Sequence, residues 1–136
     1  LVLNKDFTEK RREDLKKVMK AILEAAQWLD APGNRKKAAA WLSKPYYVNA
    51  PVAVLEARLG GNYDLGCEIG ATKYKEDNMN FYNNAFVNTP RLAHGIWFIT
   101  QYARFGYLKE LPANMKDIAD NIIMDELYAE VAKEMN

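Results

Sequence analysis

The sequence predicts a mainly α-helical fold that is interrupted by one long irregular loop. Apolar residues recur at steps of three and four positions in several segments, and proline or glycine separates those segments, which together indicate a series of amphipathic helices. Between Gly60 and Thr89, in contrast, about thirty residues pass without a sustained period. A chain of 136 residues can bury a real core, so we expect a single domain over residues 1–136.

The first expected helix covers about residues 12–30. Its apolar positions form one stripe: Leu15, Val18, Met19, Ile22, Leu23, Ala26 and Leu29. Just before this helix, Phe7 and Thr8 resemble a hydrophobic staple and an N-cap. The helix should end near Asp30, because Pro32 and the residues that follow it cannot continue it.

Two shorter helices are expected next. The second helix covers about residues 35–43 and is bounded by Asn34, a good N-cap, and by Pro45, which disfavours helical geometry in the residue before it. The third helix covers about residues 51–59. It begins with a proline in its first turn, where the missing N–H costs nothing, and a glycine pair stops it.

The loop from Gly60 to Thr89 is rich in asparagine, glycine and aromatic residues. Loops of this length are uncommon in compact domains. Five aromatic residues argue against plain disorder: Tyr63, Tyr74, Phe81, Tyr82 and Phe86. We therefore expect the loop to pack on something, such as a body that this chain lacks.

The fourth expected helix, over about residues 90–105, is apolar around most of its circumference. A threonine–proline pair supplies an N-cap and a first-turn proline, and Gly106 supplies the stop. Such a helix should be central and largely buried. A last helix over about residues 125–135 carries one apolar face, and a short helix near residues 114–119 fits between the two.

The composition is that of a globular protein, and several classes of function are disfavoured. Residues 1–44 are basic, which could indicate nucleic acid or anionic lipid as a partner, but acidic residues are interleaved with the basic ones in the first helix, which favours a solvated face over either site. No apolar run approaches the ~18 residues of a membrane span. The single cysteine, Cys67, allows no internal disulfide and is expected to be a small buried hydrophobe. The chain opens on Leu1 without an initiator methionine, which we interpret as an internal start.

Four segments, in this order, resemble one family. A Trp-x-Asp-x-Pro-x-Asn-Arg run lies within residues 24–35, and the link Leu-Ser-Lys-Pro-Tyr-Tyr-Val-Asn-Ala-Pro spans residues 42–51. A Gly-x-Tyr-Asp-x-Gly turn spans residues 61–66, and the most distinctive run, His-Gly-Ile-Trp-Phe-Ile-Thr-Gln, opens residues 94–108. Together they resemble the nitrate- and bicarbonate-binding proteins of ABC importers.

The resemblance implies that residues 1–136 form only part of a larger fold. It implies the helical carboxyl-terminal segment of a two-lobed α/β fold, the periplasmic-binding-protein fold of type II, in which the anion lies between the lobes. This segment would return to the first lobe and wrap it. Most anion ligands of the family lie upstream of such a segment, so no ligand residue is carried over. A similar domain is also fused to some transporter ATPase subunits, where it serves regulation.

Candidate chemistry within the chain is sparse. A catalytic triad would have to use the only serine, Ser43, and the only histidine, His94, and nothing around that serine resembles a nucleophile elbow. One cysteine and one histidine cannot build a zinc site. The loop carboxylates lack the spacing of a calcium site: Asp64, Glu68, Glu76 and Asp77. We therefore expect no enzyme, no metal and no cofactor.

The ligand candidates lie on the expected helix over residues 90–105. They are His94, Trp97, Gln101 and Arg104. His94 is expected to be a hydrogen-bonded structural residue, and Arg104 either clamps an anion or pairs across a packing interface. The aromatic residues of this helix are expected in the core: Trp97, Phe98, Tyr102 and Phe105.

Two hypotheses of function follow. The first is the carboxyl-terminal part of an extracytoplasmic, periplasmic or membrane-associated solute-binding protein. It would serve as a lobe scaffold in a protein that carries a small inorganic anion to an ABC permease, with nitrate or nitrite first and bicarbonate next. The second is an autonomous regulatory or protein-interaction domain, located in the cytoplasm. Nucleic acid is not an expected partner, whereas a homo-oligomer of the isolated chain is compatible with an exposed lobe-facing surface.

Overall fold

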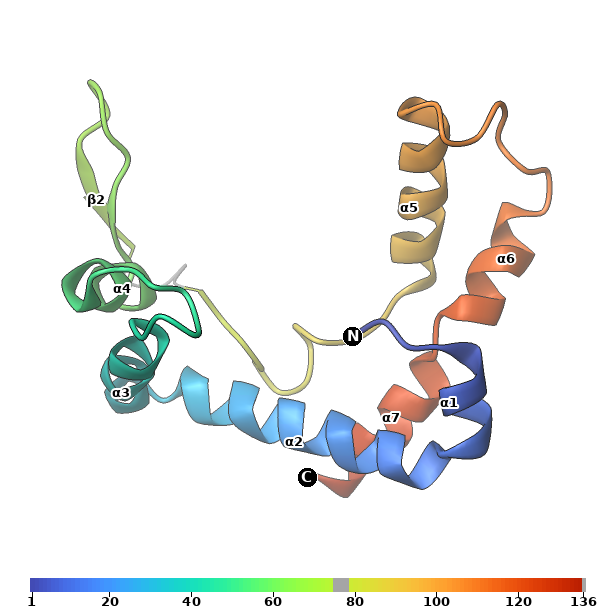
Figure 1. The fold of residues 1–136 in the computed structure, drawn as a ribbon, viewed down its shortest axis with the longest axis horizontal. Coiled ribbons are helices and arrows are strands. Elements are labelled where there is room, and N and C mark those ends of the chain that lie inside the picture. The colour runs from blue at the N-terminus through green and yellow to red at the C-terminus, as the bar shows by residue number, and fades with distance from the viewer. Residues whose placement is uncertain (75–78, 136) are drawn as a thin grey trace. The chain divides into compact units, whose positions relative to one another are not determined.

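The computed structural model describes residues 1–74 and 79–135, and helices dominate it (Figure 1). The mainly α-helical fold class is therefore confirmed. Contacts divide the chain into two compact units, residues 1–21 with 88–136 and residues 22–87, which are described separately below. Among the described residues, no helix is long and apolar enough to cross a membrane.

The first unit contains the elements at both ends of the chain. They are α1 (Lys5–Lys10), the first half of α2 (Arg12–Asp30), α5 (Leu92–Arg104), α6 (Met115–Ile122) and α7 (Asp125–Glu134). Helix α1 begins after Asn4, whose side chain accepts a hydrogen bond from the backbone N–H of Asp6 at 2.9 Å. Thr8 lies inside α1, so its expected role as an N-cap is wrong: Asn4 already satisfies the free N–H groups of the first turn.

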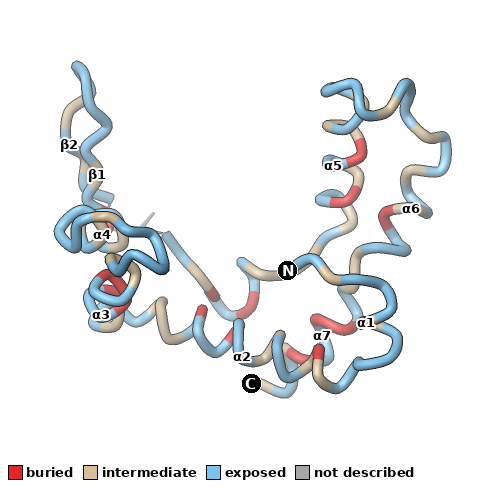
Figure 2. Tube along the Cα trace, in the orientation of Figure 1, coloured by how far each residue is buried: buried red, intermediate tan, exposed pale blue. Residues whose placement is uncertain are grey.

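Helices α5 and α6 pack side by side in this unit (Figure 1). Gly95 of α5 faces α6, and a Cβ atom placed on it would lie 2.9 Å from the Cβ atom of Ala119. Ala119 is completely buried, and Ile99 is buried one turn after Gly95. Figure 2 shows buried positions on both α5 and α6. Glycine therefore allows a closer approach of the two helices than any other residue would.

Helix α7 supplies most of the remaining core of the first unit. Leu127, Tyr128 and Val131 are buried, as is Leu15 of α2. At the edge of α7, the Lys16 ammonium group lies 2.8 Å from a carboxylate oxygen of Glu130 and 2.8 Å from one of Glu134. These hydrogen bonds raise the pKa of Lys16 above its ordinary value.

The second unit contains the second half of α2 and all elements up to the end of the long loop. They are α3 (Pro32–Leu42), α4 (Val52–Leu59) and a hairpin of β1 (Asn62–Asp64) and β2 (Ala71–Lys73). The two strands are antiparallel, with Tyr63 opposite Thr72. The loop after Gly60 is therefore not wholly irregular, because this hairpin occupies its first part.

Helix α3 begins three residues earlier than expected. Its N-cap is Ala31 and its first residue is Pro32, which has the backbone angle that a first helical turn needs. The expected N-cap, Asn34, lies inside the helix. Its side chain instead donates a hydrogen bond to the backbone carbonyl of Trp28 at 3.0 Å, across the junction of α2 and α3.

Two predictions about burial are wrong. Helix α5 is not largely buried, because only Gly95 and Ile99 of its thirteen residues are buried. Cys67 is exposed, and its φ of 50° places it in a tight turn between the strands instead of in a core. The first error follows from composition: apolar residues all around a helix predict burial only when partners surround the helix.

Candidate functional site

The four ligand candidates share one side of α5. His94, Trp97, Gln101 and Arg104 are separated by steps of three, four and three residues, which place them in one row along the helix. The row faces away from Gly95, the residue that contacts α6. His94 and Arg104 are exposed and Gln101 is half-buried, whereas the expectation that Trp97 lies in the core is wrong, since it is 56% exposed.

The remaining aromatic residues of α5 widen this row into a face. Phe98, Tyr102 and Phe105 are also exposed, with Phe105 at 69%, so none of them lies in the core as expected. The Trp97 and Phe98 rings meet edge to face, with centroids 5.1 Å apart. We call Trp97, Phe98 and Tyr102, together with the C-cap residue Phe105, the α5 aromatic face. Contiguous exposed apolar area of this kind marks a contact surface.

The geometry of the row limits what it can bind. His94 and Arg104 are ten residues apart, or about 15 Å along the helix axis, so they cannot hold the same small anion. The Arg104 guanidinium lies 5.9 Å from the centroid of the Phe105 ring. The α5 aromatic face is therefore suited to packing against a second surface, with its polar residues at the rim of the contact.

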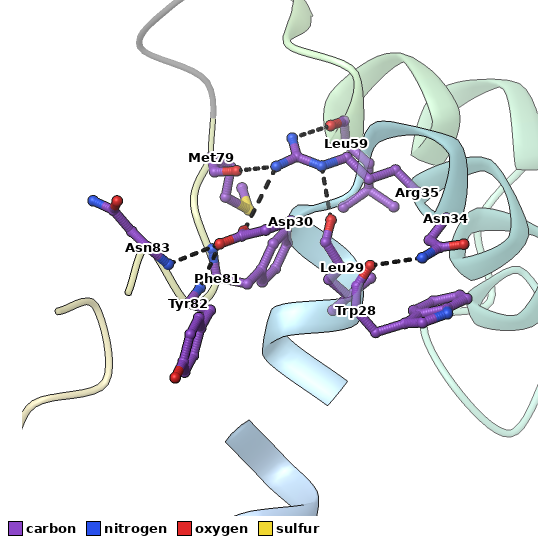
Figure 3. Close-up of polar contacts among 10 residues, drawn as sticks. All are labelled: Trp28, Leu29, Asp30, Asn34, Arg35, Leu59, Met79, Phe81, Tyr82 and Asn83. Carbon is purple, nitrogen blue, oxygen red and sulfur yellow. Dashed lines mark hydrogen bonds and ion pairs between the residues drawn. The ribbon is translucent and has the colours of Figure 1, made fainter. Parts of the chain in front are cut away.

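A second cluster, in the other unit, surrounds the buried Arg35 of α3. Its guanidinium donates hydrogen bonds to the backbone carbonyls of Leu29, Leu59 and Met79, at 3.0, 2.8 and 2.7 Å. Figure 3 shows these carbonyls arriving from the end of α2, the end of α4 and the loop after the hairpin. One buried side chain thereby holds together three segments that are distant in the sequence.

Asp30, the last residue of α2, completes the cluster. Its carboxylate accepts hydrogen bonds from the backbone N–H groups of Phe81, Tyr82 and Asn83, at 2.7, 3.0 and 2.8 Å (Figure 3). Arg35 lies 3.8 Å away. Burial by itself raises the pKa of Asp30, but the three N–H groups and Arg35 outweigh it, so the pKa is lowered overall.

The backbone turns sharply at residues 83–85, next to the peptide groups that bind the Asp30 carboxylate. Asn83, Asn84 and Ala85 have φ angles of 43°, 53° and 65°, in the left-handed region that asparagine tolerates better than most residues. Part of the asparagine content of the long loop is thereby explained. The carboxylate anchors the first residue of this turn and fixes its position against α2.

The cluster gives a physical meaning to the Trp-x-Asp-x-Pro-x-Asn-Arg run. Trp28 stacks on Trp41, with ring centroids 5.4 Å apart and planes 10° apart. Pro32 begins α3, Asn34 bonds the end of α2, and Asp30 and Arg35 bind backbone groups. Asp30 and Arg35 were not among the residues predicted to form a site. The one feature of the sequence that could have indicated their roles is that both are charged residues inside a family motif at the junction of two helices.

Metal binding finds no support in the described part of the chain. No group of three or more His, Cys, Asp or Glu side chains there could hold an ion. Asp64, which lies in β1, accepts a hydrogen bond from the backbone N–H of Gly66 at 2.9 Å and so stabilises the turn of the hairpin. Glu76 and Asp77 lie outside the described residues.

Comparison with known proteins agrees with this architecture. Residues 1–43 match the NMT1-like family. Over nearly its whole length, the chain is related to the substrate-binding proteins of the nitrate and bicarbonate type, and it corresponds to their carboxyl-terminal portion. The nitrate/nitrite binding protein NrtA of Nostoc sp. is 31% identical over 136 residues, which cover 96% of this chain and 29% of that protein. The bicarbonate-binding protein CmpA of Synechococcus elongatus is 26% identical over 99% of this chain and 31% of its own length.

A solved structure and a further relative extend the comparison. The crystal structure of the periplasmic nitrate-binding protein NrtA from Synechocystis PCC 6803 matches with a TM-score of 0.85 and 26% identity, over 98% of this chain and 34% of that chain. The nitrate import ATP-binding protein NrtC of Synechocystis sp. is 26% identical over 87% of this chain and 17% of its own length. The chain thus spans about a third or less of each of these proteins.

Proposed function

We propose that this chain is the carboxyl-terminal part of an extracytoplasmic substrate-binding protein that serves an ABC importer of a small oxyanion. Nitrate or nitrite is the first candidate for the anion, and bicarbonate the second. Within that protein the chain acts as a lobe scaffold. The observation that carries this proposal is the exposed α5 aromatic face, in a chain that aligns almost end to end with a third of such binding proteins.

The physical argument rests on what exposed aromatic residues cost. Fully burying a large apolar side chain contributes roughly 1.5–3 kcal/mol, and the four residues of the α5 aromatic face, each more than half exposed, gain less than half of this in the chain alone. An α/β lobe laid against that face would recover the stabilisation. The chain would then complete the hydrophobic cover of the lobe and hold it rigid.

A rigid lobe is what the proposed transport step requires. Binding proteins of this class close two lobes around the ligand, and ligand contacts favour the closed state. In this proposal the permease then receives the anion from the closed protein. In this proposal the polar rim of the α5 aromatic face (His94, Gln101 and Arg104) meets the lobe, and it is our candidate for contacts near the cleft.

Calorimetric titration with nitrate and with bicarbonate tests the proposal. The isolated 136-residue chain should bind neither anion tightly, whereas the longest natural polypeptide that contains it should bind at least one of them. Tight nitrate binding by the isolated chain would contradict the scaffold role. A longer polypeptide that binds neither anion would contradict the oxyanion assignment.

A second candidate is an autonomous regulatory or protein-interaction domain in the cytoplasm. The similarity to NrtC, a protein named for ATP binding, extends over 87% of the chain and favours this second candidate. Sedimentation and thermal unfolding of the isolated chain separate the two candidates. A compact monomer that unfolds in one cooperative transition supports the autonomous domain, and an associating chain without such a transition supports the scaffold.

A further inference from the structure

A second exposed aromatic surface lies in the other unit, around the end of α3. It consists of Trp41, Tyr46, Tyr47 and Val48, together with Lys37 and Lys44, and we call it the Trp41 surface. Tyr46 is 96% exposed and Tyr47 is 66% exposed. Trp41, Leu42, Lys44 and Tyr47 line a shallow hollow in it. Lys37 precedes Trp41 by four residues, so the two share a face of α3.

Ring stacking and backbone hydrogen bonds hold the Trp41 surface in place. Trp41 stacks flat on Trp28, which limits its movement. The turn that carries the tyrosines is closed by backbone hydrogen bonds from Tyr47 to the carbonyl of Lys44 at 3.0 Å and from Val48 to the carbonyl of Leu42 at 2.9 Å. The exposed rings are therefore presented by an ordered turn on a packed helix.

The charged residues in the segment that carries this surface have one sign. Between residues 31 and 55 the sequence has no aspartate or glutamate, but it has Arg35, Lys36, Lys37 and Lys44. Arg35 is buried in the cluster with Asp30, whereas the three lysines are exposed. The Trp41 surface therefore combines exposed lysine side chains with aromatic and aliphatic ones.

This chemistry differs from that of the α5 aromatic face. Helix α5, from Leu92 to Arg104, has no lysine and no tyrosine other than Tyr102. Lysine is depleted in the dry centre of protein interfaces, because burying its ammonium group is costly. The α5 aromatic face is thus suited to burial under another part of the protein, whereas the Trp41 surface is suited to a boundary that stays wet.

We propose that the Trp41 surface docks on an anionic lipid bilayer. Tryptophan and tyrosine favour the level of the lipid headgroups, where one side of the ring is apolar and the other meets water. Val48 would enter the outer edge of the acyl region, and Lys37 and Lys44 would lie against anionic headgroups. The contact is peripheral and reversible. It adds to the proposed function a surface that keeps the protein beside the membrane, whichever anion it carries.

Vesicle co-sedimentation of the whole 136-residue chain tests this proposal. The chain should bind vesicles of phosphatidylglycerol and phosphatidylcholine at least tenfold more tightly than vesicles of phosphatidylcholine alone, and added salt should reduce this difference. The double variant Lys37→Gln/Lys44→Gln should lose roughly tenfold or more of the affinity for anionic vesicles. The double variant Tyr46→Ser/Tyr47→Ser should weaken binding to both kinds of vesicle.

Matched controls place the contact on this surface. Lys109→Gln/Lys116→Gln removes two exposed lysines of the other unit and should change the affinity less than twofold. Trp97→Phe leaves Trp28 and Trp41 as the only tryptophans, and their emission should shift to shorter wavelength when anionic vesicles are added. Circular dichroism of every variant should show unchanged helix content.

Three outcomes would overturn the proposal. They are equal binding to both kinds of vesicle, equal losses in the two lysine double variants, and capture by an acidic protein surface with no vesicle binding. The nitrate titration of the longer polypeptide is independent of all three. Failure of membrane docking and failure of the proposed transport function therefore give different results.

Discussion

At the scale of single residues, Asp30 and Arg35 determine the path of the second unit. Both side chains bind backbone groups of segments far away in the sequence, and Arg35 also lies 5.6 Å from the centroid of the Phe81 ring. A buried guanidinium that loses a partner leaves carbonyl groups unsatisfied, which costs more than the hydrogen bond contributed. The cluster should therefore be sensitive to conservative changes.

Asp30→Asn should destabilise the chain by about 1–3 kcal/mol at neutral pH, because an amide cannot replace a carboxylate that accepts three N–H groups. The folded-state pKa of Asp30 lies below its ordinary value of 3.8, so the stabilisation is present above pH 3.8 and is lost as the pH falls through the folded-state pKa. Urea unfolding at several pH values should show the difference between the two proteins shrinking below pH 3.8. Asp120→Asn, the same change at an exposed carboxylate, is the control and should be nearly neutral.

Arg35→Lys should destabilise the chain by about 2–4 kcal/mol, although it keeps the charge. An ammonium group cannot reach three carbonyls in the directions that the guanidinium does, and at least one would lose its partner. Arg58→Lys is the matched control. Arg58 is exposed and donates to a single carbonyl, that of Asp64, so its change should cost less than about 0.5 kcal/mol. Equal losses in the two variants would show that the guanidinium geometry is unimportant.

At the scale of elements, the α5–α6 contact depends on the absence of one Cβ atom. Gly95 and Ala119 approach so closely that any larger pair must separate the helices. A glycine inside a helix costs roughly 0.5–1 kcal/mol relative to alanine, so the contact must contribute more than that for the unit to gain from it.

Gly95→Ala should therefore destabilise the chain by about 1–2 kcal/mol, since overpacking outweighs the better helix propensity of alanine. Thermal unfolding followed by circular dichroism measures the effect. Gly33→Ala is the control: Gly33 lies in a helix, a Cβ atom there would meet nothing within 4 Å, and the change should be neutral or stabilising. Gly95→Ala/Ala119→Gly should be more stable than the sum of the two single changes, and simple additivity would contradict direct contact.

The elements also show what could be predicted from the sequence. The first long helix was expected over residues 12–30, and α2 runs from Arg12 to Asp30, because a clear apolar period and a proline bound it. The start of α3 could not be predicted from capping preference, since Pro32 and Asn34 both offered a beginning and the bond from Asn34 to Trp28 selected the earlier one. The exposure of α5 could not be predicted at all, because burial depends on neighbours that periodicity does not report.

The candidate site was predicted in part. His94, Trp97, Gln101 and Arg104 share one side of α5, as residues at that spacing must. Their role in binding stays a prediction. The roles of Asp30 and Arg35 could not be predicted, because their partners are backbone groups of Leu59, Met79 and residues 81–83. Every residue type has the same backbone groups, so the sequence does not show which residues accept or donate these hydrogen bonds.

At the scale of the whole molecule, the chain presents more apolar surface than a self-sufficient protein should. The isolated chain should bind a hydrophobic dye such as anilinonaphthalene sulfonate and enhance its fluorescence. The triple variant Trp97→Ser/Phe98→Ser/Phe105→Ser should reduce that fluorescence at least twofold without loss of helix content, because all three side chains are more than half exposed in the chain.

The control for dye binding removes apolar residues that are exposed elsewhere. Leu1→Ser/Val2→Ser changes two highly exposed residues before α1, and it should leave the fluorescence almost unchanged, since isolated apolar side chains do not form a face. A chain that binds no dye, or that loses helix content with the triple change, would contradict an α5 aromatic face built for contact with another body.

The Asp30–Arg35 cluster has a consequence for how much the surrounding sequence can vary. Because its hydrogen bonds end on peptide groups, residues such as Leu59 and Met79 can be exchanged for others without removing a single bond, provided that the chain keeps its course. Only the aspartate, the arginine and the aromatic ring beneath the guanidinium carry side-chain requirements. A library randomised at positions 59 and 79 should thus yield many folded members, whereas one randomised at 30 and 35 should return almost none beyond the original pair.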